Sequence, residues 1–511
     1  MSNSTNKRVV LTAMVFAVAM MFIDQTIVAI AAPTIAGHLS LSATGSEWVV
    51  NSYLLALAAL FAFGGRLADL LGRRRAVVVG VIGFAAASAL CGATPRGPGA
   101  EAWLITFRAL QGASGALLFP AAVGIVVAAF PVMERGRAMA VFFGISGALT
   151  AVGPIAGGFL TQWTWRSIFW INVPVALVAL VLIAYSKPVD ERRPGRLDWI
   201  GAGLVTGAMG LIVLGLQQAG TWGWADGRTI GCLGVGLAMM GAFVAWERRT
   251  DSPLVQLRVF AQPAFAVDSA VLALVSVVFV PFFFFASVYA QIGLGENAAS
   301  AGLYVMYFFI GFVVMSQIGG RILDRRGARP AVVYGCALGA IGFFLLAGKL
   351  TNLSLGAQWP FIVLAGAGPG LMLGAASTDA TNRALSASFS EVTGITQTAR
   401  NFGASVGLAV LGTILVTRDG HTITAALTRN GVPAAIARHV AGSLTSSSPG
   451  SGAHRSPALI HDVQLAFAHS SQTVFYVMAA VMAAAFLLSV RHYPRSEAAL
   501  VAQGVAVGES R

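Results

Sequence analysis

Long apolar runs recur throughout this chain of 511 residues and constrain its fold more than any other feature. Each run is about 20 residues long, the length at which an α-helix crosses the hydrocarbon core of a bilayer. Backbone polar groups find no water there, so helices are the expected form of every run. We predict about fourteen spans, near residues 9–31, 48–68, 76–94, 103–128, 137–160, 166–186, 199–219, 229–246, 264–290, 299–320, 331–349, 359–382, 393–416 and 472–490.

Composition supports the same class of protein. Hydrophobic residues make up 57% of the chain and charged residues 10%, whereas about a quarter of a soluble domain is charged. We therefore predict an all-α polytopic membrane protein embedded in a lipid bilayer. The net charge of +13 comes mainly from arginines in short loops between apolar runs, so it indicates topology and not a nucleic-acid partner. The three cysteines lie in separate apolar runs, and we expect no metal site.

Lysine and arginine are concentrated in alternate loops, which predicts orientation by the positive-inside rule. The basic loops include Lys7 and Arg8, Arg73 to Arg75, and Arg325 with Arg326. Both chain termini are therefore expected on the cytoplasmic side of a bacterial inner membrane.

A charged turn appears twice, between two apolar runs each time. The first copy contains Gly65, Arg66, Asp69, Gly72, Arg73 and Arg74, and the second contains Gly320, Arg321, Asp324, Gly327 and Arg329. Such a repeat predicts two halves built on one plan. The alternative for each copy is a basic loop that only obeys the charge bias.

The repeat predicts a division of the chain into two pseudo-symmetric six-helix bundles with two inserted helices. The expected parts are residues 1–186, the inserted pair with its linkers at 187–262, the second bundle at 263–490 and a cytoplasmic tail at 491–511. Residues 417–471 are expected to form an external loop, with a surface helix near 434–440.

Asp24 is a carboxylate inside the first apolar run. An ionised carboxylate at that depth costs several kcal/mol, so it must be protonated, paired with a cation, or face a wet cavity. Its burial suits it to binding and releasing protons. The alternative is a structural acid hydrogen-bonded to a helix terminus.

Arg108 lies inside the fourth run, with Gln111 one turn further along. This arginine is a candidate partner for Asp24 and could relay its proton through Gln111 or water. It could equally bind backbone carbonyls of a neighbouring helix and have only a structural role.

The fifth run contains Gly153, Pro154, Gly157 and Gly158. Proline removes a helix hydrogen bond and glycine allows close helix contact, so we expect a bendable, tightly packed helix. Gly403 and Gly407 are expected to form the matching face in the second half.

Further polar and aromatic residues are weaker candidates. Asp268, Asp379 with Arg383, and Arg400 are charged residues in the second half, where no second deep carboxylate is evident. This favours neutral or monovalent substrates. An aromatic group that includes Phe283, Tyr304 and Tyr307 could line an apolar pocket, although most of these rings must meet lipid or core.

These motifs resemble those of the major facilitator superfamily, specifically its fourteen-span drug:proton antiporter branch (EmrB/QacA-like). The resemblance is carried by Asp24 to Val28, Trp48 to Val50, Gly65 to Arg75, Arg108 with Gln111, Gly153 to Gly158, and Trp165 to Pro174. It implies proton coupling at Asp24, proton relay at Arg108, a cytoplasmic gate at the Gly65 turn and an exporter motif at Gly153-Pro154. The expected substrate-cavity residues are Gln25, Trp48, Asn51, Tyr53, Phe283, Tyr304, Tyr307, Asp379 and Arg400.

No nucleotide-binding GxxxxGK[ST] motif, metal-ligand cluster or nucleophile motif is present in the sequence, so we predict neither an enzyme nor an ATP-driven pump. We expect a monomer that needs no cofactor and exports lipophilic small molecules in exchange for protons, driven by the proton motive force. The alternatives are a dedicated exporter of one metabolite, such as an antibiotic or a lipid, and a membrane receptor or enzyme.

The predicted topology can be tested by labelling. A cysteine introduced as Ser447→Cys should react with a membrane-impermeant thiol reagent in whole cells. Labelling only in inverted membrane vesicles would show that the span count is wrong.

Overall fold

The computed structural model describes residues 3–188, 197–251, 253–255, 257–383, 389–429 and 457–493. Within these ranges the chain is helical, and no strand is present. The long helices are α1 (Asn3–Leu39), α2 (Ala43–Leu71), α3 (Arg73–Gly92), α4 (Ala100–Ala129), α5 (Val132–Trp163), α7 (Asn172–Ser186), α8 (Trp199–Trp222), α9 (Gly227–Glu247), α10 (Pro263–Val288), α11 (Ala298–Arg326), α12 (Ala328–Ala347), α13 (Leu355–Arg383), α14 (Phe389–Arg429) and α16 (Pro457–His492).

Thirteen helical segments of the described residues are long and apolar enough to cross a membrane. One of them joins the short helix α6 (Ser167–Trp170) to α7. The remaining long helix is α5, which occupies the position of the predicted fifth span. The chain is therefore an all-α, multi-pass membrane protein, as predicted.

The structure corrects the bounds of the expected external loop at 417–471. Helix α14 continues to Arg429 and α16 begins at Pro457, so much of that range is helical. The extensions pack on each other, because Thr422 hydrogen-bonds Ser470 at 2.8 Å and Ile423 is buried. The expected surface helix at 434–440 lies outside the described residues.

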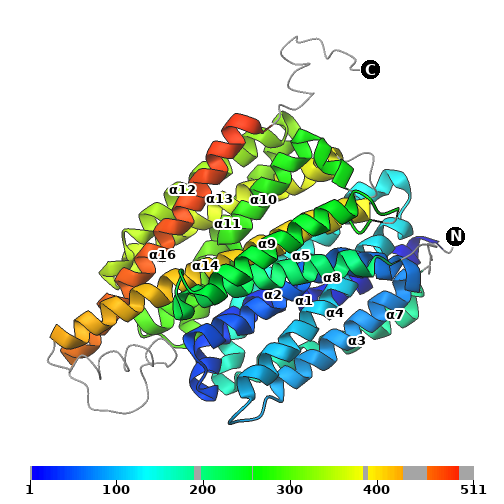
Figure 1. Ribbon diagram of the computed structural model, residues 1–511. Coiled ribbons are helices and arrows are strands. Elements are labelled where there is room, and N and C mark those ends of the chain that lie inside the picture. Colours follow the sequence, from blue (N-terminus) through cyan, green and yellow to red (C-terminus); the bar gives the residue numbers. More distant parts are fainter. Residues whose placement is uncertain are drawn as a thin grey trace.

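Two helix bundles lie side by side (Figure 1). The first contains α1 to α7, and the second contains α10 to α14 and α16. The inserted helices α8 and α9 pack on each other, and α8 also contacts α2 and α14. We call the end of the molecule that holds the start of α1 and the end of α16 the terminal face. The opposite end, where α14 ends and α16 begins, is the distal face.

The motif from Trp165 to Pro174 links helices within the first bundle. Arg166 donates to the backbone oxygens of Gly92 and Thr94 at 2.6 and 2.8 Å, which holds the end of α3. Asn172 donates to Ser88, whose hydroxyl in turn donates to the Phe169 carbonyl at 2.8 Å. These bonds satisfy backbone groups at the end of α3 and near the interruption between helices α6 and α7.

Glycines of α5 allow it to pack between the two bundles. A side chain at Gly153 would overlap Thr26 of α1, and one at Gly158 would overlap Ala298 and Ala299 of α11. In return, a side chain at Gly302 of α11 would overlap the Pro154 carbonyl. Backbones this close exclude any larger residue, so these glycines determine how the bundles meet.

The second half repeats this packing. Side chains at Gly403 and Gly407 of α14 would overlap the carbonyl oxygens of Ala273 and Val277 on α10. Helices α14 and α10 therefore contact each other through a glycine face, as α5 and α1 do. The expectation of matching small faces agrees with this geometry.

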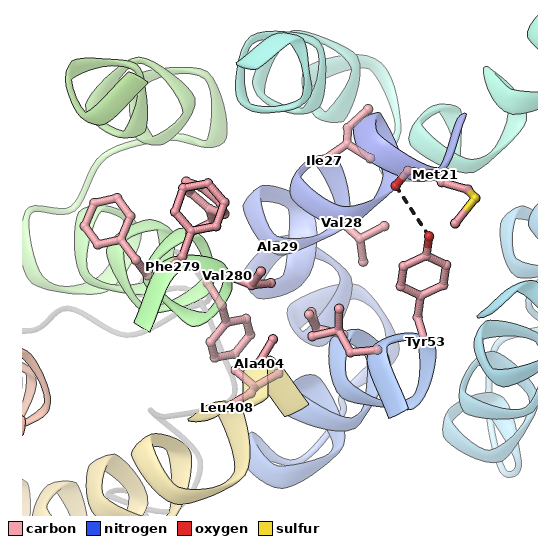
Figure 2. Close-up of a cluster of buried hydrophobic side chains, with 14 of the residues drawn as sticks. Met21, Ile27, Val28, Ala29, Tyr53, Phe279, Val280, Ala404 and Leu408 are labelled. Carbon is pink, nitrogen blue, oxygen red and sulfur yellow. Dashed lines mark hydrogen bonds between the residues drawn. The ribbon is translucent and has the colours of Figure 1, made fainter. Parts of the chain in front are cut away.

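Elsewhere the bundles meet through apolar side chains and a few hydrogen bonds. Figure 2 shows Ile27, Val28 and Ala29 of α1 beside Phe279 and Val280 of α10, with Ala404 and Leu408 of α14 nearby. Gln291 and Ser287 donate to the Ile30 carbonyl at 2.9 and 3.1 Å. Together with the α5–α11 contact, these bonds close the distal half of the interface.

We predict that Gly153→Leu will insert normally and lose transport. Leucine keeps the apolarity that drives insertion, but its side chain overlaps Thr26 and obstructs movement between α5 and α1. Substrate efflux and the amount of folded protein in the membrane should be measured together. The matched control is Gly241→Leu, because no atom lies within 4 Å of a Cβ at that position of α9. Substantial transport by Gly153→Leu would contradict the mechanical role of α5.

Candidate functional site

The structure brings Asp24, Arg108 and Gln111 together in the core of the first bundle. Arg108 donates from Nη1 to Asp24 Oδ2 at 2.5 Å and to Gln111 Oε1 at 2.7 Å. Gln111 closes the triangle by donating from Nε2 to Asp24 Oδ1 at 2.8 Å. The three side chains are at most 1% exposed. A buried acid can be protonated, face a wet cavity or pair with a cation, and in this conformation Asp24 is paired with the Arg108 cation.

Arg108 has further partners that stabilise its charge. Its Nε donates to the Val49 carbonyl of α2 at 2.9 Å, and its guanidinium lies 4.5 Å from the centre of the Tyr53 ring. A cation over an aromatic face contributes about 2 kcal/mol where water is excluded. The α2 residues therefore hold Arg108 even if Asp24 becomes neutral, so both the relay role and the structural role stay possible for this arginine.

The residues that flank Asp24 on α1 contact the glycine face of α5. Thr26 donates to the Thr150 carbonyl at 2.9 Å, and a side chain at Gly153 would overlap Thr26. Asp24 is therefore two residues from Thr26, which contacts α5.

The charged turn between α2 and α3 is held by Arg73. This side chain donates to Asp69 Oδ1 at 3.1 Å and to the Gly124 carbonyl of α4 at 3.1 Å. Gly72 has a φ of 98°, a conformation that favours glycine. Gly65, Arg66 and Arg74 lie half-buried in the same turn.

The second copy of the turn also has a glycine with positive φ, but its side-chain contacts differ. Gly327 has a φ of 78°, but Ala328 stands where the first copy has Arg73. Asp324 is exposed, and Arg329 donates to the Val490 carbonyl of α16 at 3.1 Å. Both turns thus have a glycine with positive φ, whereas among the described residues an arginine–aspartate ion pair is found in the first turn alone.

The cavity candidates of the first half differ in exposure. Gln25 and Trp48 are half-buried. Asn51 is fully buried, donates to Gln217 Oε1 of α8 at 2.6 Å and accepts a hydrogen bond from Ser405 of α14. Tyr53 lies under Arg108 and donates to the Met21 carbonyl, the bond drawn in Figure 2.

The aromatic candidates of the second half form its core. Phe283 is fully buried and stacks on Phe309, with ring centroids 5.2 Å apart. Tyr304 donates to Gln358 Oε1 at 2.9 Å. Tyr307 is half-buried near Trp359, with ring centroids 6.2 Å apart. Of the three, Tyr307 is the most exposed.

Two charged candidates of the second half, Asp268 and Asp379, both lie close to the hydroxyl of Tyr493 at the terminal face. Asp268 is fully buried near the terminal end of α10, and Asp379 is half-buried on α13. Arg400 donates to Gln397 Oε1 on its own helix at 3.0 Å, and no ion pair across the bundle is recorded for it among the described residues. Arg383 is the expected partner of Asp379 on the same helix face, and its side chain lies outside the described residues.

Glu47 is a buried acid that sequence analysis did not select. It is 3% exposed and lies one turn inside α2, between the two bundles. The predicted span begins at residue 48, so Glu47 falls just outside it. The N-cap signal at Ser42, whose side chain accepts from Gly45 N at 2.9 Å, would have placed the helix start earlier.

Comparison with known proteins identifies the family. The model of the Major Facilitator Superfamily matches residues 14–408. The chain belongs to this superfamily. It is accordingly a membrane transporter and not an enzyme.

Several relatives have names that state an export or resistance role. The chain is 35% identical over 415 residues to the tetracenomycin C resistance and export protein of Streptomyces glaucescens, covering 80% of this chain and 76% of the relative. It is 30% identical over 497 residues to the multidrug resistance protein Stp of Mycobacterium tuberculosis, covering 93% and 90%. It is 34% identical over 425 residues to the cephamycin export protein CmcT of Amycolatopsis lactamdurans, covering 81% and 84%.

Solved structures share the fold. A bacterial homolog of the human lysosomal transporter Spinster superposes with a TM-score of 0.62 at 19% identity, covering 96% of this chain and 98% of that chain. The xylose transporter XylE of E. coli superposes with a TM-score of 0.60 at 12% identity, covering 96% and 100%.

We predict that Arg108→Met will destabilise the protein by about 3–5 kcal/mol, because it leaves the Asp24 carboxylate buried without its cation. The double variant Asp24→Asn/Arg108→Met should be more stable than Arg108→Met alone, since it removes both charges. Thermal unfolding of the purified protein tests both expectations. Equal stability of the single and double variants would contradict an ion pair in the folded state.

Proposed function

We propose that this transporter exports lipophilic or amphipathic compounds, neutral or cationic, in exchange for protons. Its relatives named as drug-resistance and antibiotic-export proteins support the export role. The observation that supports proton exchange is the buried triangle of Asp24, Arg108 and Gln111, because it holds an acid and a cation where water is excluded.

The proposed coupling begins with proton loading at Asp24. When the distal side opens toward an acidic medium, Asp24 takes up a proton and its attraction to Arg108 weakens. Arg108 keeps the Val49 carbonyl, the Tyr53 ring and Gln111 as partners. Its charge is therefore still stabilised when Asp24 is neutral. When the terminal side opens, the proton leaves and the ion pair forms again. One proton thus enters for each cycle of outward substrate movement.

Contacts between neighbouring helices couple the protonation of Asp24 to the packing of the rest of the molecule. Breaking the ion pair frees α1 from α4, and α1 packs through Thr26 and Ile27 on Gly153 and Gly157 of α5. Helix α5 in turn contacts α11 of the other bundle. We infer that protonation alters the packing of α1 and α5, and that this biases the alternation of the two bundles.

We place the transporter in a bacterial cytoplasmic membrane, with the terminal face toward the cytoplasm. The concentration of arginine and lysine in the loops of that face supports this orientation. The charged turns around Arg73 and Asp324 then lie on the cytoplasmic side, where we propose that they act in gating.

A second candidate function is export of a single metabolite. Two relatives carry names that refer to one antibiotic each, tetracenomycin C and cephamycin. A susceptibility panel in an efflux-deficient host distinguishes the two. Protection against several unrelated lipophilic compounds supports multidrug export, and protection against one compound supports a dedicated exporter.

We predict that Asp24→Asn will abolish transport driven by a pH gradient. Asparagine keeps the shape and the hydrogen bonding of the side chain but cannot bind a proton. In proteoliposomes loaded with a pH dye, the wild-type protein should move protons when substrate is added, and Asp24→Asn should not. Substrate binding should be reduced only modestly.

The matched control is Asp226→Asn, which removes a carboxyl from the exposed N-cap of α9. It should leave transport unchanged. If Asp24→Asn vesicles still concentrate substrate under an imposed pH gradient, coupling occurs elsewhere, and Asp268 and Asp379 are the next candidates.

A further inference from the structure

Glu47 is a buried carboxyl at the contact between the bundles, and neither the family motifs nor the proposed coupling site includes it. Its carboxyl lies against the backbone of Gly412 on α14, where any added side chain would overlap both carboxyl oxygens. Glu47 belongs to the first bundle and Gly412 to the second. The contact therefore exists only while the bundles are closed at the distal face.

A polar seam surrounds this contact and joins three helices. Thr44 and Asn51 are about one turn on either side of Glu47 on α2. Asn51 is hydrogen-bonded to Gln217 of α8 and to Ser405 of α14. Thr413, next to Gly412, donates to the Leu216 carbonyl of α8 at 2.7 Å. We call Thr44, Glu47, Asn51, Leu216, Gln217, Ser405, Gly412 and Thr413 the distal seam.

Within the described part of the chain, Glu47 has no hydrogen bond or ion pair from its carboxyl to another residue. The facing stretch of α14 from Asn401 to Val416 and the whole of α8 contain no titratable side chain. Away from their terminal ends, the neighbouring helices carry Asp24 and His38 on α1, Glu101 and Arg108 on α4, and Arg400, Arg418, Asp419 and His421 on α14. None of them is recorded as a partner of Glu47 among the described residues.

We propose that Glu47 is a second proton-binding site, and that closing the distal seam requires its protonation. An ionised carboxylate buried without a partner costs several kcal/mol, whereas the neutral acid costs much less. When the bundles separate at the distal face, Glu47 meets water, where a glutamate has a pKa of about 4.3 and is ionised at neutral pH. The closed seam binds the proton and the open seam releases it.

This proton does not cross the membrane, because it enters and leaves from the distal side. It instead makes the gate itself sensitive to pH: acid favours the closed seam and alkali favours the open one. By linkage, one proton per closure changes the ratio of closed to open molecules tenfold per pH unit, between the pKa of the open form and that of the closed form. The inference rests on the proposed alternating-access export and assigns the distal gate its own titrating group.

The test measures distal opening directly. Spin labels are attached at Arg96→Cys and Glu296→Cys, two exposed positions on the distal turns of the first and second bundles. Cys232→Ser removes the half-buried native cysteine, while Cys91 and Cys336 are buried. The protein is placed in lipid nanodiscs, and the label distances are recorded from pH 5 to pH 8. Asp24→Asn is used throughout, so that Glu47 is tested without the proposed coupling acid.

In the Asp24→Asn protein, the fraction of molecules with a long distance between the two labels should rise with pH by up to tenfold per pH unit. Glu47→Gln should show no such rise and stay mainly closed, whereas Glu47→Asp should retain it. The matched control Glu101→Gln removes a nearby carboxyl that contacts Gly45 of its own bundle, and it should behave as the parent protein. Gly412→Ala should favour the open form at every pH, because its methyl group occupies the position of the carboxyl.

A pH dependence that persists in Glu47→Gln overturns the proposal, as does a parent protein whose label distances do not change with pH. Loss of the pH dependence in Glu101→Gln would also overturn it. The proteoliposome assay on Asp24→Asn tests the export mechanism independently, so either idea can fail while the other stands.

Discussion

An ion pair enclosed in a region without water determines much of this structure. Asp24 and Arg108 are fully desolvated, and each would cost several kcal/mol there without the other. Their pairing fixes α1 against α4, and the Val49 carbonyl and Tyr53 ring extend the attachment to α2. The first bundle thus has a charged centre, and we propose that its packing changes when the Asp24 carboxyl is protonated. Such a dependence is what proton-driven movement requires.

The two halves share one plan but differ in chemistry. Both have a glycine face between paired helices, α5 on α1 and α14 on α10. The first half adds the buried Asp24–Arg108 ion pair and the Arg73–Asp69 ion pair. The corresponding region of the second half contains stacked phenylalanines and the neutral Tyr304–Gln358 hydrogen bond, and Ala328 replaces the arginine of the turn. We propose that the proton-linked change begins at the ion pair of the first bundle.

The inserted helices are more than a spacer between the halves. Helix α8 accepts hydrogen bonds from α2 through Gln217 and from α14 through the Leu216 carbonyl, so it bridges both bundles near the distal face. When the distal face opens, α8 must either lose these hydrogen bonds or move together with one of the two bundles. The bridge places Glu47 in a seam of otherwise neutral polar groups, where a single ionised carboxylate is costly.

Local sequence determined the spans, because the hydrocarbon requirement is met by about 20 consecutive apolar residues wherever they occur. It also indicated the glycine faces and the acid and arginine of the first bundle, since charges in apolar runs need compensation. The sequence suggested that Arg108 could meet Asp24, but the contact and the closing hydrogen bond of Gln111 depend on how α1 and α4 pack. Their roles in transport stay predictions.

Other features were decided only by tertiary structure. Helices α14 and α16 continue beyond the predicted spans, and their extensions are joined by a Thr422–Ser470 hydrogen bond that no local pattern reveals. Tyr304 was a candidate for a pocket but is hydrogen-bonded within the core. Glu47 lies near the start of a helix, where sequence predicts solvent. It is buried because Gly412, distant in the chain, offers no side chain and lets α14 cover it. Burial depends on which helices meet, and that is a property of the whole fold.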